Sequence, residues 1–226
     1  MVIRQRAVLA EDKRERHQAI LDAAERLLAR SPERVANMAE VADEAGLAKG
    51  TVYLYFPSKE ELLLALHERN IDDFFLALQG LLARPQPITI DDMLGLVQSH
   101  MVDDPTFLPL ATRCLGIMAT EVPRDVARAF KERMSARLSG AGAGLERHFS
   151  ELPGGRGVAL LRHSYALILG LWQMSSAGAG EGSVDVEHCP MHTFDYAEQL
   201  APALRALWRG TVGRAAMAAV PAILEA

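Results

Sequence analysis

Apolar residues along this chain recur mostly at the three- and four-residue spacing of an α-helix, with polar residues between them. Near the N-terminus, two stripes of this kind are formed by Ile20, Ala24, Leu27 and Leu28 and by Met38, Val41, Ala42 and Ala45. Each stripe is typical of the buried side of an amphipathic helix. Runs of β-branched residues, which are typical of strands, do not occur, so the pattern predicts an all-α fold.

Three helix starts are expected where a capping side chain precedes, by three residues, a carboxylate that can reach back to it. These pairs are Asp12 and Glu15, Asn37 and Glu40, and Ser58 and Glu61. Between the second and third pairs, Gly46 suits the left-handed conformation that ends a helix. The order predicts a helix, a tight turn and a short helix within residues 37–56.

A long helix is expected from Ser58 to about Leu82, where the prolines of RPQPIT end the pattern. Asp104 is the expected cap of a later helix that starts at Pro105. The SGAGAG stretch at 139–144 predicts a kink or break, because glycine lowers helix stability. The remaining expected elements are helices over 90–102, 105–119, 123–150, 156–177, 192–209 and 211–224, and a long loop over 175–190.

Composition and charge limit the classes of function that the chain can have. With 50% hydrophobic residues the chain has enough apolar surface to bury a core, and its net charge of −5 excludes coating of nucleic acid by bulk electrostatics. No apolar run is long enough to span a membrane or form a signal peptide, so a soluble, cytoplasmic protein without membrane contact is expected. The motifs G-x-S-x-G, G-x-x-x-x-G-K and H-E-x-x-H are absent, so we expect neither an enzyme nor a cofactor.

Residues 37–56 meet the needs of a helix-turn-helix, whose second helix enters the major groove of DNA. Val52 and Phe56 are expected to face the core of the domain. The outward and N-terminal sides of this helix then carry Lys49, Gly50, Thr51, Tyr53 and Tyr55. The alternative is that the aromatic residues belong to the core of a helical domain and that the lysines are solvated, but a core requires neither the glycine nor the clustered cations.

At this point the sequence resembles a known family. The stretch from Ile20 to Leu66 is similar to the N-terminal domain of the TetR family of transcriptional regulators, in the order AEVADEAG, KGTVYLYF and PSKEEL. The resemblance implies an N-terminal helix-turn-helix domain (1–60) and a larger C-terminal effector-binding and dimerisation domain (61–226). Two positions depart from the pattern: Ala48 stands where a serine is frequent, and Leu54 where a histidine, tyrosine or tryptophan is common.

The expected partner is double-stranded operator DNA. Lysines supply charge to phosphates, the glycine permits close approach of the backbone, and the hydroxyls of threonine and tyrosine can bond phosphates or bases. The expected DNA-binding residues are Asn37, Lys49, Gly50, Thr51, Tyr53, Tyr55 and Lys59. An N-terminal arm of basic residues is a second source of phosphate contacts, with disorder without a role as the alternative. Its members are Arg4, Arg6, Lys13 and Arg14.

A homodimer is expected because one recognition helix buries too little surface to select a site alone. Apolar residues on two sides of the helix over 156–177 call for two partners, one of which would be a second subunit. The resemblance implies that this helix and the one over 192–209 form the interface, the alternative being a monomeric core. The expected interface residues are Leu161, Ile168, Leu200, Leu204 and Trp208.

The middle helices carry methionines and aromatic residues that suit a small, largely apolar effector, although such stripes also form ordinary cores. The expected ligand-binding residues are Phe74, Met101, Cys114, Met118, Phe130, Met134, His163 and Trp172. The function expected is that of a repressor released from its operator by this effector.

Alternatives to this function remain open at the level of sequence. They are a helical interaction module that does not bind DNA, an activator and a metal-responsive regulator. A metal site would use the cluster Asp185, His188, Cys189 and His192, although Pro190 interrupts the spacing that would align the two imidazoles. An exposed loop is the preferred interpretation of the cluster.

Overall fold

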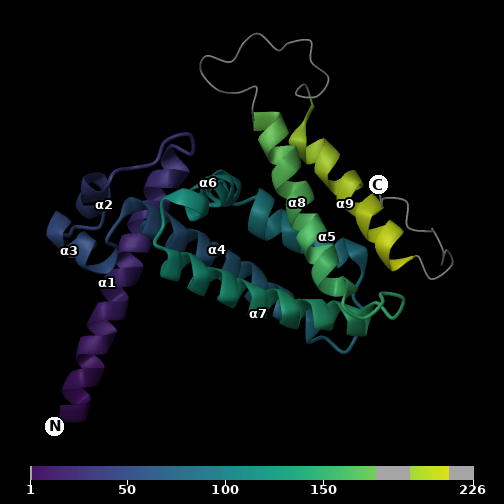
Figure 1. The fold of residues 1–226 in the computed structure, drawn as a ribbon, viewed down its shortest axis with the longest axis horizontal. Helices are drawn as coiled ribbons and strands as arrows, with labels where there is room; N and C mark the ends of the chain where they lie inside the picture. Colours follow the sequence, from purple (N-terminus) through teal and green to yellow (C-terminus); the bar gives the residue numbers. More distant parts are fainter. Residues whose placement is uncertain (1, 177–193, 214–226) are drawn as a thin grey trace. The chain divides into compact units, whose positions relative to one another are not determined.

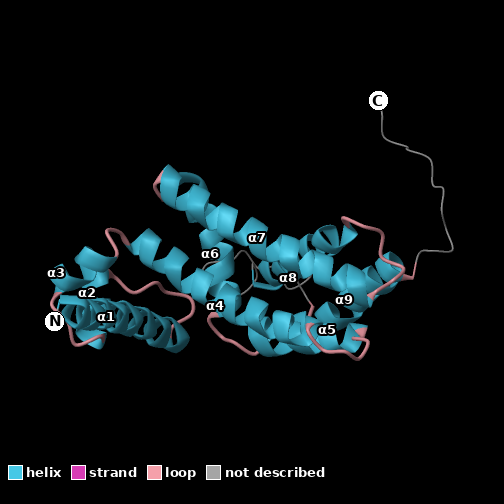
Figure 2. Cartoon of the chain, turned by 90° about the horizontal axis from the view of Figure 1, so that it is seen from below, coloured by secondary structure: helices cyan, strands magenta, loops and turns pink. Residues whose placement is uncertain are grey.

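The computed structural model describes residues 2–176 and 194–213. Within these ranges every regular element is helical (Figures 1 and 2), which confirms the all-α prediction. A short π-helical segment, Gln98–Val102, follows α5. The α-helices are α1 (Val2–Arg30), α2 (Met38–Glu44), α3 (Lys49–Tyr55), α4 (Lys59–Leu82), α5 (Ile90–Val97), α6 (Phe107–Thr120), α7 (Arg124–His148), α8 (Arg156–Ser176) and α9 (Tyr196–Val212).

The chain divides into two compact units. The first comprises Met1–Asp72 and Asp104–Phe130, and the second comprises Asp73–Asp103 and Lys131–Ala226. Two of the three boundaries between the units fall within helices, since α4 and α7 each begin in the first unit and end in the second, and the third lies between the π-helical segment and α6. The predicted division into a DNA-binding domain (1–60) and an effector-binding and dimerisation domain (61–226) stays a prediction. The compact units differ from it in that the first also contains α6.

The core of the first unit combines the N-terminal helices with α6. Ile20 of α1, Val52 of α3 and Leu66 of α4 are fully buried, and Leu110 and Cys114 of α6 complete the same cluster. Burying such side chains contributes on the order of 1.5–3 kcal/mol each relative to leaving them exposed. The first unit therefore depends on α6, which is distant in sequence, as well as on the helix-turn-helix itself.

Two of the three predicted caps are confirmed. The side chain of Asn37 caps α2, and the hydroxyl of Ser58 accepts the Glu61 N–H at 3.1 Å at the start of α4. The prediction for Asp12 was wrong, because α1 begins at Val2 and Asp12 lies inside it. The basic residues assigned to an N-terminal arm likewise belong to α1.

Other boundaries are also corrected. The helix expected over 90–102 is divided into α5 and the π-helical segment, and α5 is capped by Thr89, whose hydroxyl accepts the Asp92 N–H at 3.1 Å. Helix α6 begins at Phe107 and not at residue 105, because the Asp104 carboxylate bonds the backbone and hydroxyl of Thr106, which delays the first helical turn. Helix α9 begins at Tyr196 and continues through residue 211 to Val212.

The glycine-rich stretch does not break α7, contrary to the expected kink or break. A Cβ atom on Gly142 would lie 2.6 Å from Val158 Cγ2 and 2.7 Å from the Val158 backbone nitrogen in α8. Gly157 of α8 faces the Gly142 backbone in turn, so the two helices meet at backbone distance. The Gly157 N–H also donates to Glu146 Oε1 at 2.9 Å. These glycines therefore serve helix packing.

In the second unit α8 and α9 lie side by side (Figure 1). Leu160 and Ile168 of α8 and Leu204 of α9 are fully buried, and Trp208 Nε1 donates to Ser164 Oγ at 2.9 Å. The expected loop over 175–190 lies outside the described residues except for Ser175 and Ser176, which end α8. The cluster around Cys189 and the part of the expected last helix beyond residue 213 also lie outside them.

None of the described helices combines the length and the apolar character needed to cross a membrane.

Candidate DNA-binding surface

The start of α2 is held by reciprocal hydrogen bonds. The N–H groups of Ala39 and Glu40 donate to Asn37 Oδ1 at 2.9 and 3.2 Å, and the Asn37 N–H donates to Glu40 Oε2 at 2.7 Å. Arg34 donates to both oxygens of the same Glu40 carboxylate, and these bonds lower the pKa of Glu40. Asn37 is exposed, but its side-chain oxygen is committed to the cap.

The turn between α2 and α3 follows from the backbone of Gly46. Its φ of 66° lies in the left-handed region, which glycine adopts without the steric cost of a Cβ atom. The Leu47 N–H then donates back to the Ala42 carbonyl at 2.9 Å, a bond typical of a Schellman motif. Ala48 precedes α3 without a side-chain cap. Helix α3 is therefore oriented by the turn and by its packing.

Helix α3 presents one buried and one exposed side. Val52 is fully buried, and Phe56, directly after the helix, is also buried, as predicted. The exposed side carries Lys49, Gly50, Tyr53 and Leu54, while Thr51 and Tyr55 are half-buried on its flanks. A Cβ atom on Gly50 would meet no atom within 4 Å, so the fold itself does not require glycine there.

The exposed side of α3 is cationic and aromatic. Lys49 Nζ lies 5.9 Å from the ring centroid of Tyr53, within the range of a cation–π contact. Lys59, at the start of α4, lies 3.7 Å from the Glu60 carboxylate, a contact that solvent screens because the lysine is partly exposed. Lys49, Gly50 and Tyr53 thus share the surface of α3, whereas Lys59 and the capping Asn37 belong to neighbouring helix starts.

Tyr55 is less accessible than the sequence suggested. It packs against the core of the first unit, and its ring centroid is 6.4 Å from that of His17 in α1. The His17 ring is 4.7 Å from that of Phe56. Burial, together with the nearby cations Arg69 and Lys13, lowers the pKa of His17. The half-buried Tyr55 therefore helps to fix α3 on α1.

Ion pairs hold the helices beneath this surface. Arg69 of α4 lies 2.6 Å from Asp22 and 2.8 Å from Glu25, both in α1. Arg26 of α1 lies 2.8 Å from Glu44 at the end of α2. These contacts join α1 to both of its neighbours, so α3 rests on a framework with a defined orientation.

Sequence reasoning missed the role of Arg113. The guanidinium of this α6 residue donates to the backbone carbonyls of Pro32 and Glu33, at 2.7 Å in both cases. These carbonyls belong to the loop between α1 and α2. No local sequence signal pairs residues some eighty positions apart, so this anchor of the helix-turn-helix was found only in the structure.

The eight expected ligand-binding residues are divided between the units. Cys114, Met118 and Phe130 belong to the first unit, and Phe74, Met101, Met134, His163 and Trp172 belong to the second. Cys114 is a core residue whose Sγ lies 3.7 Å from the Leu63 carbonyl oxygen, and burial raises the pKa of its thiol to about 12. His163 is exposed.

Three of the second-unit residues have aromatic or apolar surroundings. The ring centroid of Phe74 lies 5.5 Å from that of Phe75 and 6.5 Å from that of His100. Met101 is buried, and the Trp172 ring lies edge-on to Tyr196 at 5.3 Å. Their aromatic and apolar side chains suit an apolar effector, but they are equally typical of an ordinary hydrophobic core.

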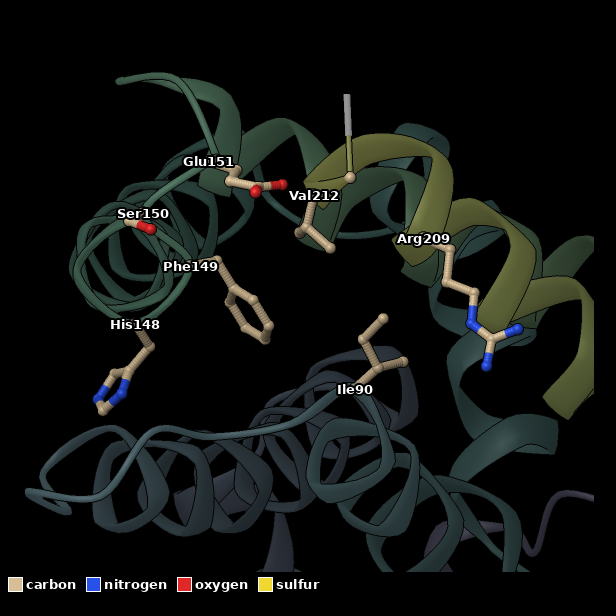
Figure 3. Close-up of a pocket in the computed structure, with 8 residues that line it drawn as sticks. Ile90, His148, Phe149, Ser150, Glu151, Arg209 and Val212 are labelled. Atoms are coloured by element: carbon tan, nitrogen blue, oxygen red, sulfur yellow. The ribbon is translucent and has the colours of Figure 1, made fainter. Parts of the chain in front are cut away.

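A pocket of about 410 Å³ lies elsewhere in the second unit. The side chains of Ile90, Phe149 and Val212 point toward a common space, and the ring of His148 points away from it (Figure 3). His148 Nε2 is instead within 2.9 Å of the Leu82 carbonyl oxygen. None of the eight predicted ligand-binding residues lines this pocket, whose remaining wall is formed by Ser150, Glu151, Arg209 and Gly213.

The expected dimer residues hold one chain together. The side chains of Leu161, Ile168, Leu200, Leu204 and Trp208 are all buried within the single chain. Leu204, for example, is only 1% exposed. Burial within one chain is what an intramolecular core requires, and the role of these five residues in a dimer stays a prediction.

Comparison with known proteins gives two matches that together cover most of the chain. Residues 20–66 match the model of bacterial regulatory proteins of the tetR family, and residues 68–215 match that of a Tetracyclin repressor-like, C-terminal domain. The crystal structure of a Mesorhizobium loti protein assigned to the TetR family shares the fold, with a TM-score of 0.58 and 18% identity over 88% of this chain and 96% of that chain.

Curated relatives match over shorter stretches. The fatty acid metabolism regulator protein of Bacillus subtilis is 34% identical over 64 residues, or 28% of this chain and 33% of the relative. The HTH-type transcriptional regulator EthR of Mycobacterium tuberculosis is 38% identical over 79 residues, or 35% of this chain and 37% of the relative. The matches thus span about a third of the length of these curated relatives.

Proposed function

The chain belongs to the TetR family of bacterial regulatory proteins, and we propose that it represses transcription by binding double-stranded operator DNA through α3. The observation that carries this proposal is the exposed side of α3, which presents Lys49, Gly50 and Tyr53 together. Val52, on the opposite side of the same helix, is buried in the core. A short, firmly seated helix with a cationic outer side suits the major groove. The role is regulatory and not catalytic, and it places the protein in the cytoplasm with its DNA.

The contacts divide into those that position the protein and those that select a sequence. Lys49 and Lys59 neutralise phosphates, and Gly50 allows the α3 backbone to approach the DNA. Tyr53 and Thr51 carry hydroxyls that reach phosphate or base edges. Asn37 and Tyr55 act mainly by holding α2 and α3 in place, since the former caps α2 and the latter packs on the core.

Lys49→Ala and Lys59→Ala should each weaken binding about tenfold at 0.1 M salt and reduce the slope of log affinity against log salt by about 2, because each removes one phosphate contact from each subunit of a dimer. The measurement is a mobility shift with duplex DNA from the region upstream of the protein's own gene. Lys131→Ala, on the exposed side of α7, is the matched control and should change neither quantity.

An unchanged slope in both variants would contradict the phosphate role. A wild-type protein that shifts no DNA at any salt concentration would instead favour a helical interaction module. Tyr53→Phe and Thr51→Ala should reduce affinity for operator more than for random DNA. Equal losses on both kinds of DNA would show that these two residues only anchor the protein.

We propose a homodimer formed by the exposed sides of α8 and α9. Ala166 and Gly170 of α8 are exposed four residues apart, and α9 exposes Pro202, Ala206 and Gly210 at the same spacing. A Cβ atom on either glycine would meet no other atom within 4 Å. Small side chains allow helices of two subunits to approach closely, since the interaxial distance depends on the residues at the contact.

Ala166→Arg should convert the dimer to a monomer and lower operator affinity, because a long charged side chain separates the helices. Gln79→Arg, at an exposed position of α4, is the control and should leave the dimer intact. Light scattering at micromolar concentration measures both masses. A monomeric wild type, or an Ala166→Arg protein that stays dimeric, would contradict the proposed interface. Leu204 is unsuitable for this test, since a charge at a buried position would unfold the subunit.

We further propose that a small, largely apolar effector binds the second unit near Phe74 and Met101 and releases the protein from DNA. Helix α4 is continuous from the first unit, which carries α3, into the second, so a shift of this helix is a direct route between the two. Release requires the effector to bind the DNA-incompetent form more tightly.

A coupling of about 1–3 kcal/mol would lower DNA affinity about 5- to 150-fold. The test screens apolar compounds for a rise in melting temperature and then measures operator affinity with each hit. A compound that protects Phe74 and Met101 from hydrogen exchange and leaves operator affinity unchanged would refute effector release.

A further inference from the structure

Leu54 is the most exposed large hydrophobic side chain among the described residues. It is 84% exposed, compared with 69% for Leu76, 53% for Leu115 and 42% for Tyr53. The core does not need the Leu54 side chain, because Val52 and Phe56 make the core contacts in this part of the chain. The side chain of Leu54 therefore adds almost nothing to the stability of the fold by burial.

The surroundings of Leu54 are those of the proposed DNA-reading surface. Residues 49, 50, 53 and 54 follow the i, i+1, i+4, i+5 spacing of one side of a helix, and all four are exposed. Leu54 thus lies on the same side of α3 as Lys49 and Tyr53. A single leucine beside a cation is too small an apolar area for the core of a protein interface, which needs a contiguous patch.

We propose that Leu54 contacts the 5-methyl group of a thymine in the major groove and makes the protein selective for thymine at that position. Thymine presents the only apolar group among the base edges of the major groove. The amino group of cytosine or adenine facing the same leucine would lose hydrogen bonds to water without a replacement. This inference rests on the proposed function, and it assigns to Leu54 a reading role that the polar residues of α3 do not supply.

The test removes the methyl group from the DNA and the side chain from the protein. Duplex DNA from upstream of the gene is footprinted with the wild-type protein, and each protected thymine is then replaced by uracil, which lacks only the methyl group. At one position in each half-site, uracil should weaken the wild type about fourfold, and about fifteenfold when both half-sites are changed, as expected for loss of one buried methyl contact each.

In Leu54→Ala the same uracil substitutions should have no effect, because the partner of the methyl group is gone. Leu115→Ala is the matched control: it truncates another exposed leucine, on α6, and should retain the wild-type preference for thymine. Circular dichroism of both variants should match the wild type, since neither side chain is buried.

The outcomes separate this inference from the function on which it rests. A wild type that shifts no DNA contradicts the proposed function. A wild type that binds DNA and tolerates uracil at every protected position, or a Leu54→Ala protein with an undiminished uracil penalty, overturns the role of Leu54 alone. A change of mass in light scattering for Leu54→Ala, with thymine preference retained, would assign the residue to a protein contact and also overturn the inference.

Discussion

Gly142→Ala should lower the free energy of unfolding of the second unit by about 1–3 kcal/mol, whereas Gly140→Ala, two residues earlier in α7, should raise it by about 0.5–1 kcal/mol. At Gly142 the new methyl group would lie 2.7 Å from the Val158 backbone nitrogen, which cannot move without displacing α8. At Gly140 the methyl group would meet no atom within 4 Å, so only the gain in helix propensity remains.

The chain provides a selective probe for this comparison. Its two tryptophans, Trp172 in α8 and Trp208 in α9, both belong to the second unit. Tryptophan fluorescence during urea unfolding therefore reports on that unit. Gly157→Ala, on the other side of the α7–α8 contact, should destabilise it like Gly142→Ala. Equal stability of the Gly140 and Gly142 variants would mean that the two helices do not meet at backbone distance.

Acidification should also have a large effect: it should lower the stability of the first unit because of His67. His67 of α4 is buried, with its ring centroid 5.7 Å from that of Phe107 and 6.5 Å from that of Phe130. Burial lowers its pKa from 6.5 to about 4, although the charge of Glu68 acts in the opposite direction. The unfolded chain therefore binds a proton between pH 6.5 and 4 that the folded chain does not.

The free energy of unfolding must then fall as the pH decreases through this window, by up to about 1.4 kcal/mol per pH unit. Above and below the window, the contribution of His67 to this free energy is constant. Between pH 7 and pH 5 the loss should be about 2 kcal/mol. Urea unfolding followed by circular dichroism measures it, with tryptophan fluorescence as the internal reference for the second unit. His67→Phe should remove this part of the pH dependence, and identical pH profiles of the variant and the wild type would exclude His67 as its source.

Local signals in the sequence predicted the helix-turn-helix well. The caps at Asn37 and Ser58, the turn at Gly46 and the inward side chain of Val52 each depend on neighbours within a few residues, so a pattern could identify them. Asp12 shows the limit of the same logic, since a carboxylate three residues after an aspartate also occurs inside a helix. The cap at Thr89 carried a comparable signal, T-x-x-D, and could have been found.

Features set by distant contacts were not predictable. The glycines of α7 were interpreted from helix propensity alone, but their role depends on Val158 and Gly157 of another helix. The apolar stripes of α8 and α9 could fit an intramolecular core or a subunit interface equally well, and Leu204 and Trp208 are buried within the single chain. For the same reason the anchoring bonds of Arg113 could not be found from sequence.

The discontinuous first unit has a consequence for how such proteins can exchange parts in evolution or in the laboratory. Leu110 and Cys114 of α6 complete a core whose other members all precede residue 67. A hybrid gene joined at one crossover near residue 66 would pair this helix-turn-helix with a foreign α6. That helix would replace Leu110 and Cys114 of the core and also Arg113, whose side chain bonds the loop between α1 and α2. Transplanting the DNA specificity of this protein intact therefore requires three crossovers, one on each side of the segment that carries α5 and a third after α6.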